Sequence, residues 1–452
     1  MVLAVGAALL LLLGHAPVAH ANGRYPKADQ LVIAPDDDAF LTVRTTFGFL
    51  VSGDAGQNWD WLCERAVGYS GVQDPTIASL AGGTLLASLA EGIARSTNRG
   101  CNWSFSDADL GGAPVIDLTL RKAAPSQALA LVWDAQTVGY RARILSSNDE
   151  GRSFSAYGRP IDPEVLVTTI DVAESDAHRV YASGTRSIDG VRSASLFASD
   201  DDGEHWSEYP APFDPKLEQG LYIAAVDPKD ADTVYLRTSS ATVSRLLVSH
   251  DGGKQFTVAY SGSLLSFALS PDGKTLYFGG EDGLYGGLAR DLKFEKRASL
   301  RLLCLAASAG RVYACSDEHS GFTVGVSSDE GFTFEPLLHL KTVRGPLACS
   351  ADECASDWPL VRAQLGIPLP IEPGDGGGAG APGDAGAPGD GGAPSDAGRP
   401  SVPAGAPAKE SSCALGQRGA ERTSALTLLF GCALAALSQR RRSPARSRLR
   451  AR

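Results

Sequence analysis

The chain has little positive charge for its length and no long apolar run. It has 452 residues and a formal net charge of −11. A nucleic-acid-binding domain needs a basic face for phosphates, so this balance argues against that class. The longest apolar stretches, 2–13 and 425–437, are shorter than the roughly 20 residues of a stable membrane-spanning helix. Hydrophobic residues make up 43% and aromatic residues 7%, which argues against a wholly disordered chain.

The N-terminus has the pattern of an export signal. An apolar stretch from Val2 to Leu13 is followed by Pro17 and by Ala19-His20-Ala21, which places small residues at both recognition positions of a cut before Asn22. A buried N-terminal helix is the alternative interpretation. Pro17 and the Ala-x-Ala site favour export, so we predict a signal peptide over 1–21.

The C-terminus combines Cys413, a short apolar run over 425–437 and the triplet Arg440-Arg441-Arg442. Residues 414–452 carry nine Arg and one Glu, which leaves −19 on residues 1–413. The Arg cluster is typical of a segment held on the cytoplasmic side of a membrane. This arrangement resembles the myxobacterial C-terminal sorting signal (MYXO-CTERM). The resemblance implies a sorting and anchor tail over 413–452, processed near Cys413, on a protein kept at the cell surface.

Between body and tail, the chain is almost entirely Gly, Ala, Pro, Asp and Ser from Gly374 to Pro407. Such a composition buries too little apolar area to offset its ordering entropy, so we predict a disordered linker over 373–412. Gly recurs at every third position from Gly374 to Gly392, which is also the collagen pattern. Seven interrupted triplets are few for a triple helix, and an extended tether is the preferred interpretation.

The strongest signal in the body is an internal repeat. Six octads follow the pattern Ser-x-Asp-x-Gly-x-x-aromatic, and an eroded seventh occupies 287–294. They start at 52, 96, 147, 199, 249, 287 and 327, a spacing of 38 to 52 residues. Short β-type runs such as 233–236, 244–248 and 311–314, punctuated by turns, precede the later copies. This period predicts four-stranded blades of an all-β, seven-bladed β-propeller over 22–340.

Each octad has the composition of a fixed turn, because Ser and Asp oxygens bond nearby backbone N–H groups and Gly accepts a positive φ. The structural residues predicted from this pattern are Ser52, Asp54, Gly56 and Trp59; Asn98, Gly100 and Trp103; Asp149, Gly151 and Phe154; Asp201, Gly203 and Trp206; Asp251, Gly253 and Phe256; and Asp329, Gly331 and Phe334. The octads resemble Asp boxes, the bacterial neuraminidase repeat of sialidases, xyloglucan-degrading enzymes, photosystem assembly factors and sortilin-type receptors. The resemblance implies that each octad joins the third and fourth strands of a blade at the periphery, and that the axial surface decides function.

Six cysteines remain after Cys413 and Cys432 are set aside, an even number in an exported body. Cys304 and Cys315 flank a turn at Ala309-Gly310, which predicts a cross-strand pair. The proximity of Cys63 and Cys101 to the first two octads suggests a second bridge between neighbouring blades. Cys349 and Cys354 would then close a small loop in a segment, 341–372, that caps the propeller or fastens its end. A metal site is disfavoured because His319 is the only histidine close to any pair.

No catalytic constellation is evident. A sialidase needs three Arg around a carboxylate and a Tyr-Glu nucleophile. Arg44, Arg237 and Arg245 lie in or beside expected strands with Tyr235 nearby, yet the family's early Arg-Ile-Pro motif is absent from the first blade. The acidic triplets 36–38 and 200–202 leave a two-carboxylate glycosidase open, although Asp is expected in turns for backbone reasons.

Other motifs are weak. Residues 251–254 hold Gly and Lys without the phosphate-loop pattern, and His178, His205, His250, His319 and His339 are dispersed. The catalytic and ligand-binding residues therefore stay unassigned, with no cofactor, no metal and no nucleic-acid partner expected. The sequence favours an exported, envelope-anchored binding module for an extracellular glycan or surface protein. The alternative is a glycoside hydrolase on the same propeller.

Overall fold

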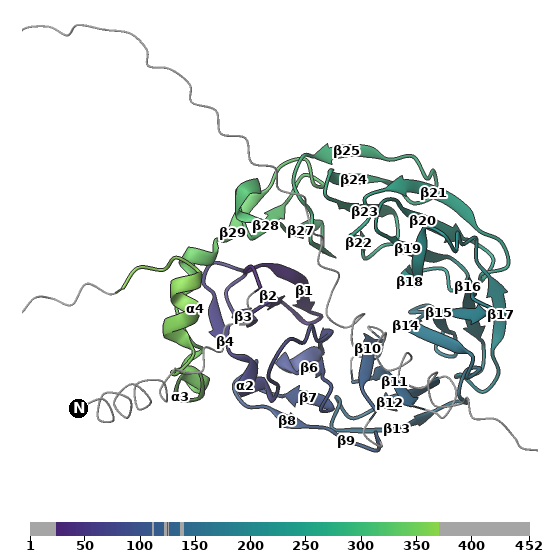
Figure 1. The fold of residues 1–452 in the computed structure, drawn as a ribbon. Helices are drawn as coiled ribbons and strands as arrows, with labels where there is room; N and C mark the ends of the chain where they lie inside the picture. Colours follow the sequence, from purple (N-terminus) through teal and green to yellow (C-terminus); the bar gives the residue numbers. More distant parts are fainter. Residues whose placement is uncertain (1–23, 111–112, 122–123, 125, 136–139, 370–452) are drawn as a thin grey trace, which may run out of the picture. The chain divides into compact units, whose positions relative to one another are not determined.

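The computed structural model describes residues 24–369, except 111–112, 122–123, 125 and 136–139. The predicted signal peptide, the predicted linker over 373–412 and the tail, including Cys413, lie outside the described residues. Seven antiparallel sheets follow one another along the chain as the blades of a β-propeller (Figure 1). The predicted fold class is confirmed: the chain is an all-β, seven-bladed propeller.

The first three blades occupy residues 28–157. Their strands are β1 Ala28–Ala34, β2 Asp37–Thr45, β3 Gly48–Ser52 and β4 Asp60–Leu62; β5 Ile77–Ser79, β6 Leu85–Ser88, β7 Ile93–Ser96 and β8 Ser104–Phe105; and β10 Val115–Leu120, β11 Ala128–Ala135, β12 Tyr140–Ser147 and β13 Ser153–Tyr157. A short strand, β9 Asp107–Ala108, adds to the outer edge of blade three, parallel to β13. A short helix, α2 Glu64–Val67, and a 3-10 turn, η1 Ala81–Gly83, lie between strands.

The remaining blades occupy residues 165–338. Their strands are β14 Val165–Val172, β15 Val180–Ile188, β16 Val191–Ser199 and β17 Ser207–Pro210; β18 Glu218–Val226, β19 Val234–Ser240, β20 Ser244–Ser249 and β21 Thr257–Gly262; β22 Ser266–Leu269, β23 Thr275–Gly280, β24 Gly283–Leu288 and β25 Glu295–Ala298; and β26 Cys304–Ser308, β27 Arg311–Cys315, β28 Val324–Ser327 and β29 Glu335–Leu338. The apolar runs predicted at 233–236, 244–248 and 311–314 lie in β19, β20 and β27. A 3-10 turn, η2 Glu318–Ser320, precedes β28.

Each intact octad occupies the turn between the third and fourth strands of its blade. In blade five, Ser249 Oγ donates to Asp251 Oδ1 at 2.9 Å and accepts from the Gly253 N–H at 2.8 Å. Asp251 Oδ1 also accepts from the Gln255 N–H at 2.9 Å. The octads of blades one, two, three, four and seven repeat these contacts, with Asn98 replacing Asp in blade two. Hydrogen bonds of the Ser and Asp side chains therefore stabilise the turn.

Backbone conformation explains the glycine of the octad. Two successive residues take a left-handed φ, as at Gly252 (74°) and Gly253 (102°). A Cβ on Gly253 would lie 2.7 Å from Leu196 of the preceding blade, so the turn is also packed against its neighbour. The eroded copy in blade six has no glycine in its turn, and Leu292 takes the positive φ of 48° there. Five of the intact octads also place an L residue at such a φ, from 58° to 60°, but follow it with the octad glycine.

The ring is closed by the segment that follows blade seven. Residues 344–347 run parallel to β4, the outermost strand of blade one, where the Trp61 N–H donates to Gly345 O and the Leu347 N–H to Trp61 O, both at 2.7 Å. The same segment contains η3 Leu340–Thr342, η4 Ala348–Ser350, α3 Ala351–Cys354 and α4 Trp358–Gln364. Val361 and Leu365 join one apolar cluster with residues of blades one and seven. We call residues 340–369 the clasp.

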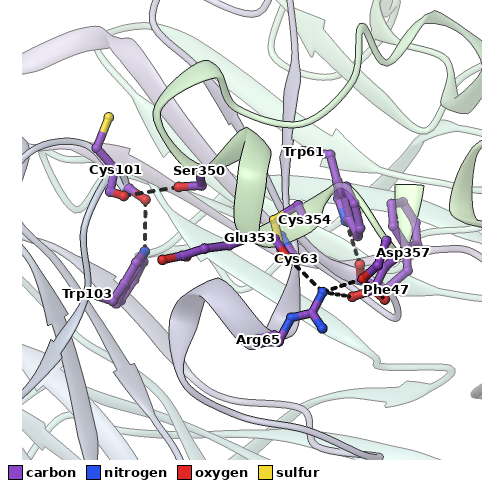
Figure 2. The surroundings of a disulfide bond; sticks show 12 residues. Phe47, Trp61, Cys63, Arg65, Cys101, Trp103, Ser350, Glu353, Cys354 and Asp357 are labelled. Atoms are coloured by element: carbon purple, nitrogen blue, oxygen red, sulfur yellow. Dashed lines mark hydrogen bonds and ion pairs between the residues drawn. A yellow bond between two sulfur atoms is a disulfide. The ribbon is translucent and has the colours of Figure 1, made fainter. Parts of the chain in front are cut away.

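Two disulfide bonds attach the clasp to the first two blades. Cys63 pairs with Cys354, and Cys101 pairs with Cys349. Figure 2 shows the first bridge beside Arg65, which donates to Glu353 O at 2.6 Å and to Asp357 Oδ2 at 3.0 Å. The predicted Cys63–Cys101 and Cys349–Cys354 pairs are therefore wrong. Ring closure brings residues almost 300 positions apart into contact, and proximity along the sequence could not reveal this.

The third disulfide was predicted correctly. Cys304 and Cys315 occupy directly paired positions on β26 and β27, and they are bonded. Three disulfide bonds among the described residues indicate an oxidising, extracellular environment. No helix within the described ranges is long and apolar enough to cross a membrane.

Candidate functional site

The first strand of each blade lies toward the centre of the ring (Figure 1). These inner strands are β1, β5, β10, β14, β18, β22 and β26. Any axial site must therefore be built from their side chains and from the loops at their ends. Several of these strands carry β-bulges, which re-aim individual side chains.

At three bulges, a polar side chain bonds the backbone of the next blade. Gln30 exchanges two hydrogen bonds of 2.9 Å with the backbone of Ile77. Asp117 Oδ2 accepts from the Ile170 N–H at 3.1 Å, and Thr169 Oγ1 accepts from the Ile223 N–H at 2.8 Å. Sequence reasoning missed these residues. A polar residue inside an otherwise apolar strand, as in Val115–Leu120, is the signal that could have revealed them.

Asp117 is the most perturbed acid of the inner strands. Burial deep within the ring raises its pKa to about 7, against the opposing effect of hydrogen bonds from the Ile170 and Leu118 N–H groups. The charge of Asp171 on the next inner strand raises that pKa further. Asp171 itself accepts a hydrogen bond from Thr119 Oγ1 at 3.0 Å. Two carboxyl groups with different environments therefore belong to neighbouring inner strands, β10 and β14.

The three arginines considered for a sialidase-like cluster do not come together. Arg44, in blade one, donates to Asp74 O at 2.9 Å and Pro75 O at 3.4 Å. Arg245, in blade five, makes two bonds of 2.7 and 2.5 Å to Glu218, a buried carboxylate. Arg237 belongs to the same blade, but its side chain stacks over Tyr222, with 4.7 Å between its Cζ and the ring centroid.

Tyr235, considered as the partner of those arginines, is an interior packing residue. It is buried, and its ring centroid lies 5.6 Å from that of Phe267 in blade six. Burial raises its pKa, and the charges of Asp227 and Asp230 raise it further. A phenol that is so hard to ionise is poorly placed to act as a nucleophile.

The two acidic triplets hold blades together. Asp36 Oδ2 accepts from the Gly82 N–H, Asp37 pairs with Arg99 at 2.7 Å, and Asp38 accepts from Ser308 Oγ at 2.9 Å. These contacts tie blade one to blades two and seven.

The triplet of blade four makes contacts within its own blade and one contact to blade three. Asp200 pairs with Arg179, Asp201 closes its octad, and Asp202 accepts from the Tyr157 hydroxyl at 2.8 Å. Arg179 also pairs with Asp232 of blade five.

Histidines are spread over the ring. His178 contacts Asp202 at 2.7 Å, His205 contacts Asp201 at 2.6 Å, and His339 contacts Glu318 at 2.9 Å. His250 reaches Thr233 Oγ1 at 3.0 Å. Among the residues that the structure describes, no three His, Cys, Asp or Glu side chains form a metal-binding group.

An open recess of about 210 Å³ lies between the N-terminal segment, blade seven and the clasp. Its lining residues are Tyr25, Pro26, Glu318, Leu340, Lys341, Gln364 and Leu365. Glu318 is committed to its neighbours, because it accepts from the Leu340 N–H at 2.7 Å and contacts His339. The recess therefore belongs to the packing of the clasp.

Comparison with known proteins gives a likeness of fold. No protein-family model matches the chain, and no curated protein matches it. Among solved structures, the chain is similar to an ancestral GH74 enzyme, at 13% identity and a TM-score of 0.47 over 70% of this chain. It spans 45% of the length of that enzyme.

Two further solved structures are similar to the chain. The Kuenenia stuttgartiensis hydrazine synthase is 13% identical with a TM-score of 0.47, and the match covers 70% of this chain and 99% of that one. A Hadza microbial sialidase is 15% identical with a TM-score of 0.37, and the match covers 62% and 72%. The seven-bladed fold rests on the sheets of the chain itself, and the site is argued from its own residues.

Proposed function

We propose that the protein is an exported, envelope-anchored binding module that engages an extracellular glycan or surface protein through its propeller. In this proposal the octads are Asp boxes, the linker is a spacer and the tail is a sorting and anchor segment. The disulfide bonds support an oxidising location, and the N- and C-terminal sequence patterns support export and retention.

One observation carries the choice of binding over catalysis. The acidic and basic side chains that could have formed a glycosidase site are mostly engaged in structural contacts within or between blades. Arg44 and Asp37 contact a neighbouring blade, whereas Arg245 pairs with Glu218 inside blade five. A residue whose charge is engaged in such a contact is unavailable for chemistry on a substrate.

The test is to incubate the purified chain with a panel of glycans and surface proteins and to record both binding and released sugar. Saturable binding without released sugar is the expected result. Sugar release that survives purification to homogeneity would contradict the proposal.

A glycoside hydrolase is the second candidate, and Asp117 is the observation that favours it. An acid with a pKa near 7 can hold a proton for a leaving group, and Asp171 supplies a second carboxyl on the neighbouring strand. If released sugar is detected, Asp117→Asn must abolish it for this candidate to stand. An equally active Asp117→Asn variant would eliminate Asp117 as the proton donor.

A further inference from the structure

Three hydrogen-bond donors gather on one face of blade five. Tyr222 on the inner strand β18 is paired in register with Arg237 on β19. Ser239 follows Arg237 by two residues, so it lies on the same face of the strand. The ring of Tyr222 folds back over Gly220, where a Cβ would come within 2.8 Å of it. Since Gly220 is the partner of Ser239, the phenol and the Ser239 hydroxyl lie over the same part of the sheet.

These donors have no hydrogen-bond acceptor among the described residues. Arg237 contacts the ring of Tyr222, and neither it nor the Tyr222 and Ser239 hydroxyls form a hydrogen bond or ion pair within the described ranges. Two other tyrosines of the ring do have acceptors: the Tyr157 hydroxyl donates to Asp202, and the Tyr181 hydroxyl donates to Ala231 O.

The position of Arg237 is unfavourable for its positive charge. Burial lowers its pKa, and the neighbouring Tyr222 is the only group that opposes the shift. Arg245, in the same blade, is paired in the usual way, because the carboxylate of Glu218 neutralises its charge. A partly buried arginine without a matching anion is less favourable for the folded state than a paired one. Because Arg237 and Tyr222 are half-buried, an anion from solvent can still reach them.

The chemistry of the three donors defines the ligand group. A guanidinium presents a planar fork that matches a carboxylate, and two hydroxyls beside it can donate to the same group. The site lies near the end of blade five where β18 begins, because the ring of Tyr222 extends toward Gly220.

The surroundings of the site favour a protein ligand. Leu217 precedes β18, Val243 precedes β20 and Leu265 precedes β22, so all three lie at one end of blades five and six. Their side chains are 46 to 57% exposed. Exposed aliphatic groups at the same end of the blade as a half-buried charge are suited to a peptide that carries apolar side chains beside its carboxylate, more than to a hydroxyl-rich glycan.

We propose that Arg237, Tyr222 and Ser239 form a binding site for a carboxylate of a partner protein, with apolar side chains next to that carboxylate resting on Leu217, Val243 and Leu265. This inference rests on the proposed function as a binding module and assigns its ligand class and contact residues.

The first experiment uses the purified chain and two matched probes, N-acetyl-leucine and N-acetyl-leucinamide, which differ in the carboxylate. N-acetyl-leucine is expected to bind, measured by NMR titration, and the amide to bind at least tenfold more weakly. Arg237→Met should abolish binding of the acid, and Arg237→Lys should weaken it. Arg290→Ala, which removes an exposed arginine of blade six, is the control and should leave binding unchanged. Equal binding of acid and amide, or full binding by Arg237→Met, would overturn the inference.

A second measurement separates this site from a structural arginine. Without added anions, Arg237→Met should melt at the same or a higher temperature than the natural chain, because an unmatched buried charge is gone. A large drop in melting temperature would show that Arg237 supports the fold, which contradicts the inference. Binding of glucuronate through Arg237 without binding of N-acetyl-leucine would reassign the site to an acidic glycan. A partner that binds the natural chain and Arg237→Met equally well would leave the general binding function standing and remove this site.

Discussion

At the scale of single residues, the propeller depends on short polar side chains that complete backbone hydrogen bonds. The serine of an octad is buried, and its hydroxyl both donates and accepts within the turn. The acid beside it is held ionised: in blade seven, hydrogen bonds from the side chain and N–H of Thr333 lower the pKa of Asp329 to about 2. The turn of blade seven therefore stays closed well into the acidic range, because the Asp329 carboxylate protonates only near pH 2.

The octad serine gives a direct test of this role. Ser249→Ala leaves the Gly253 N–H and Asp251 without their partner, which should cost about 1–3 kcal/mol of unfolding free energy. Asp251→Asn should be tolerated better than Asp251→Ala, since Asn98 serves in blade two. Urea denaturation would measure these changes. The control, Ser261→Ala, changes an exposed serine of the same blade and should be nearly neutral; equal effects for the two serines would show that the octad does not hold its turn.

Asp117 predicts that the stability of the folded chain falls as the pH rises, which is opposite in sign to the effect of the octad acids with lowered pKa. Its folded pKa of about 7 lies above the unfolded value of about 3.9, so the folded chain retains a proton that the unfolded chain has lost between these limits. This contribution to stability is complete below about pH 4 and is lost as the pH rises through 7. The stability of Asp117→Asn relative to the natural chain should therefore increase between pH 4 and 7. A difference that stays constant across this range would contradict the assignment.

At the scale of elements, the sequence predicts features formed by residues close together in the chain. It does not predict features that depend on how strands are aligned with one another. The octads predict the blades because a turn of eight residues carries its own hydrogen bonds. The Cys304–Cys315 pair is predictable because the two residues flank one hairpin. The Tyr222–Arg237 pair could not be predicted: β18 shifts register between Glu218 and Gly220 and again between Ile223 and Ala225, so no simple alternation identifies the face of each side chain.

Functional candidates chosen by residue type failed for a related reason. Arg44, Arg237 and Arg245 were grouped because each belongs to a strand, yet their roles depend on which side chains face them in the assembled sheets. Glu218 neutralises Arg245, whereas Arg237 meets an aromatic ring. The informative property of Arg237 is the lack of an acceptor among the described residues, and this becomes visible only when the sheets are assembled.

The two kinds of disulfide predict unequal effects on stability. Cys304–Cys315 spans 11 residues, whereas Cys63–Cys354 spans 291. In the chain-entropy view these loops correspond to about 2.8 and about 5.7 kcal/mol, so replacing all four clasp cysteines by Ala should cost at least about 3 kcal/mol more than replacing the hairpin pair. Midpoints of guanidinium unfolding would measure the difference. Equal losses would mean that the clasp remains ordered without its bridges.

At the scale of the whole molecule, ring closure is separate from the repeat. All four strands of blade one come from one continuous stretch of chain, so the last blade is not completed by an exchanged strand. Closure instead depends on the clasp, which adds residues 344–347 to the edge of blade one and shares a core with blades one and seven. Opening the ring therefore requires loss of the clasp, while every octad can stay intact.

The Cys63–Cys354 bridge has a mechanical consequence. A pull applied between residues 24 and 369 passes along 24–63, through the two sulfur atoms and out along 354–369, so blades two to seven lie inside a covalent loop that carries no load. With the bridge intact, these segments extend by at most about 190 Å, whereas after reduction residues 24–369 can extend by about 1,200 Å. Single-molecule stretching with and without reductant would measure both lengths. When force is applied at both ends of the described chain, the bridge would thus leave blades two to seven unloaded, including the proposed site on blade five.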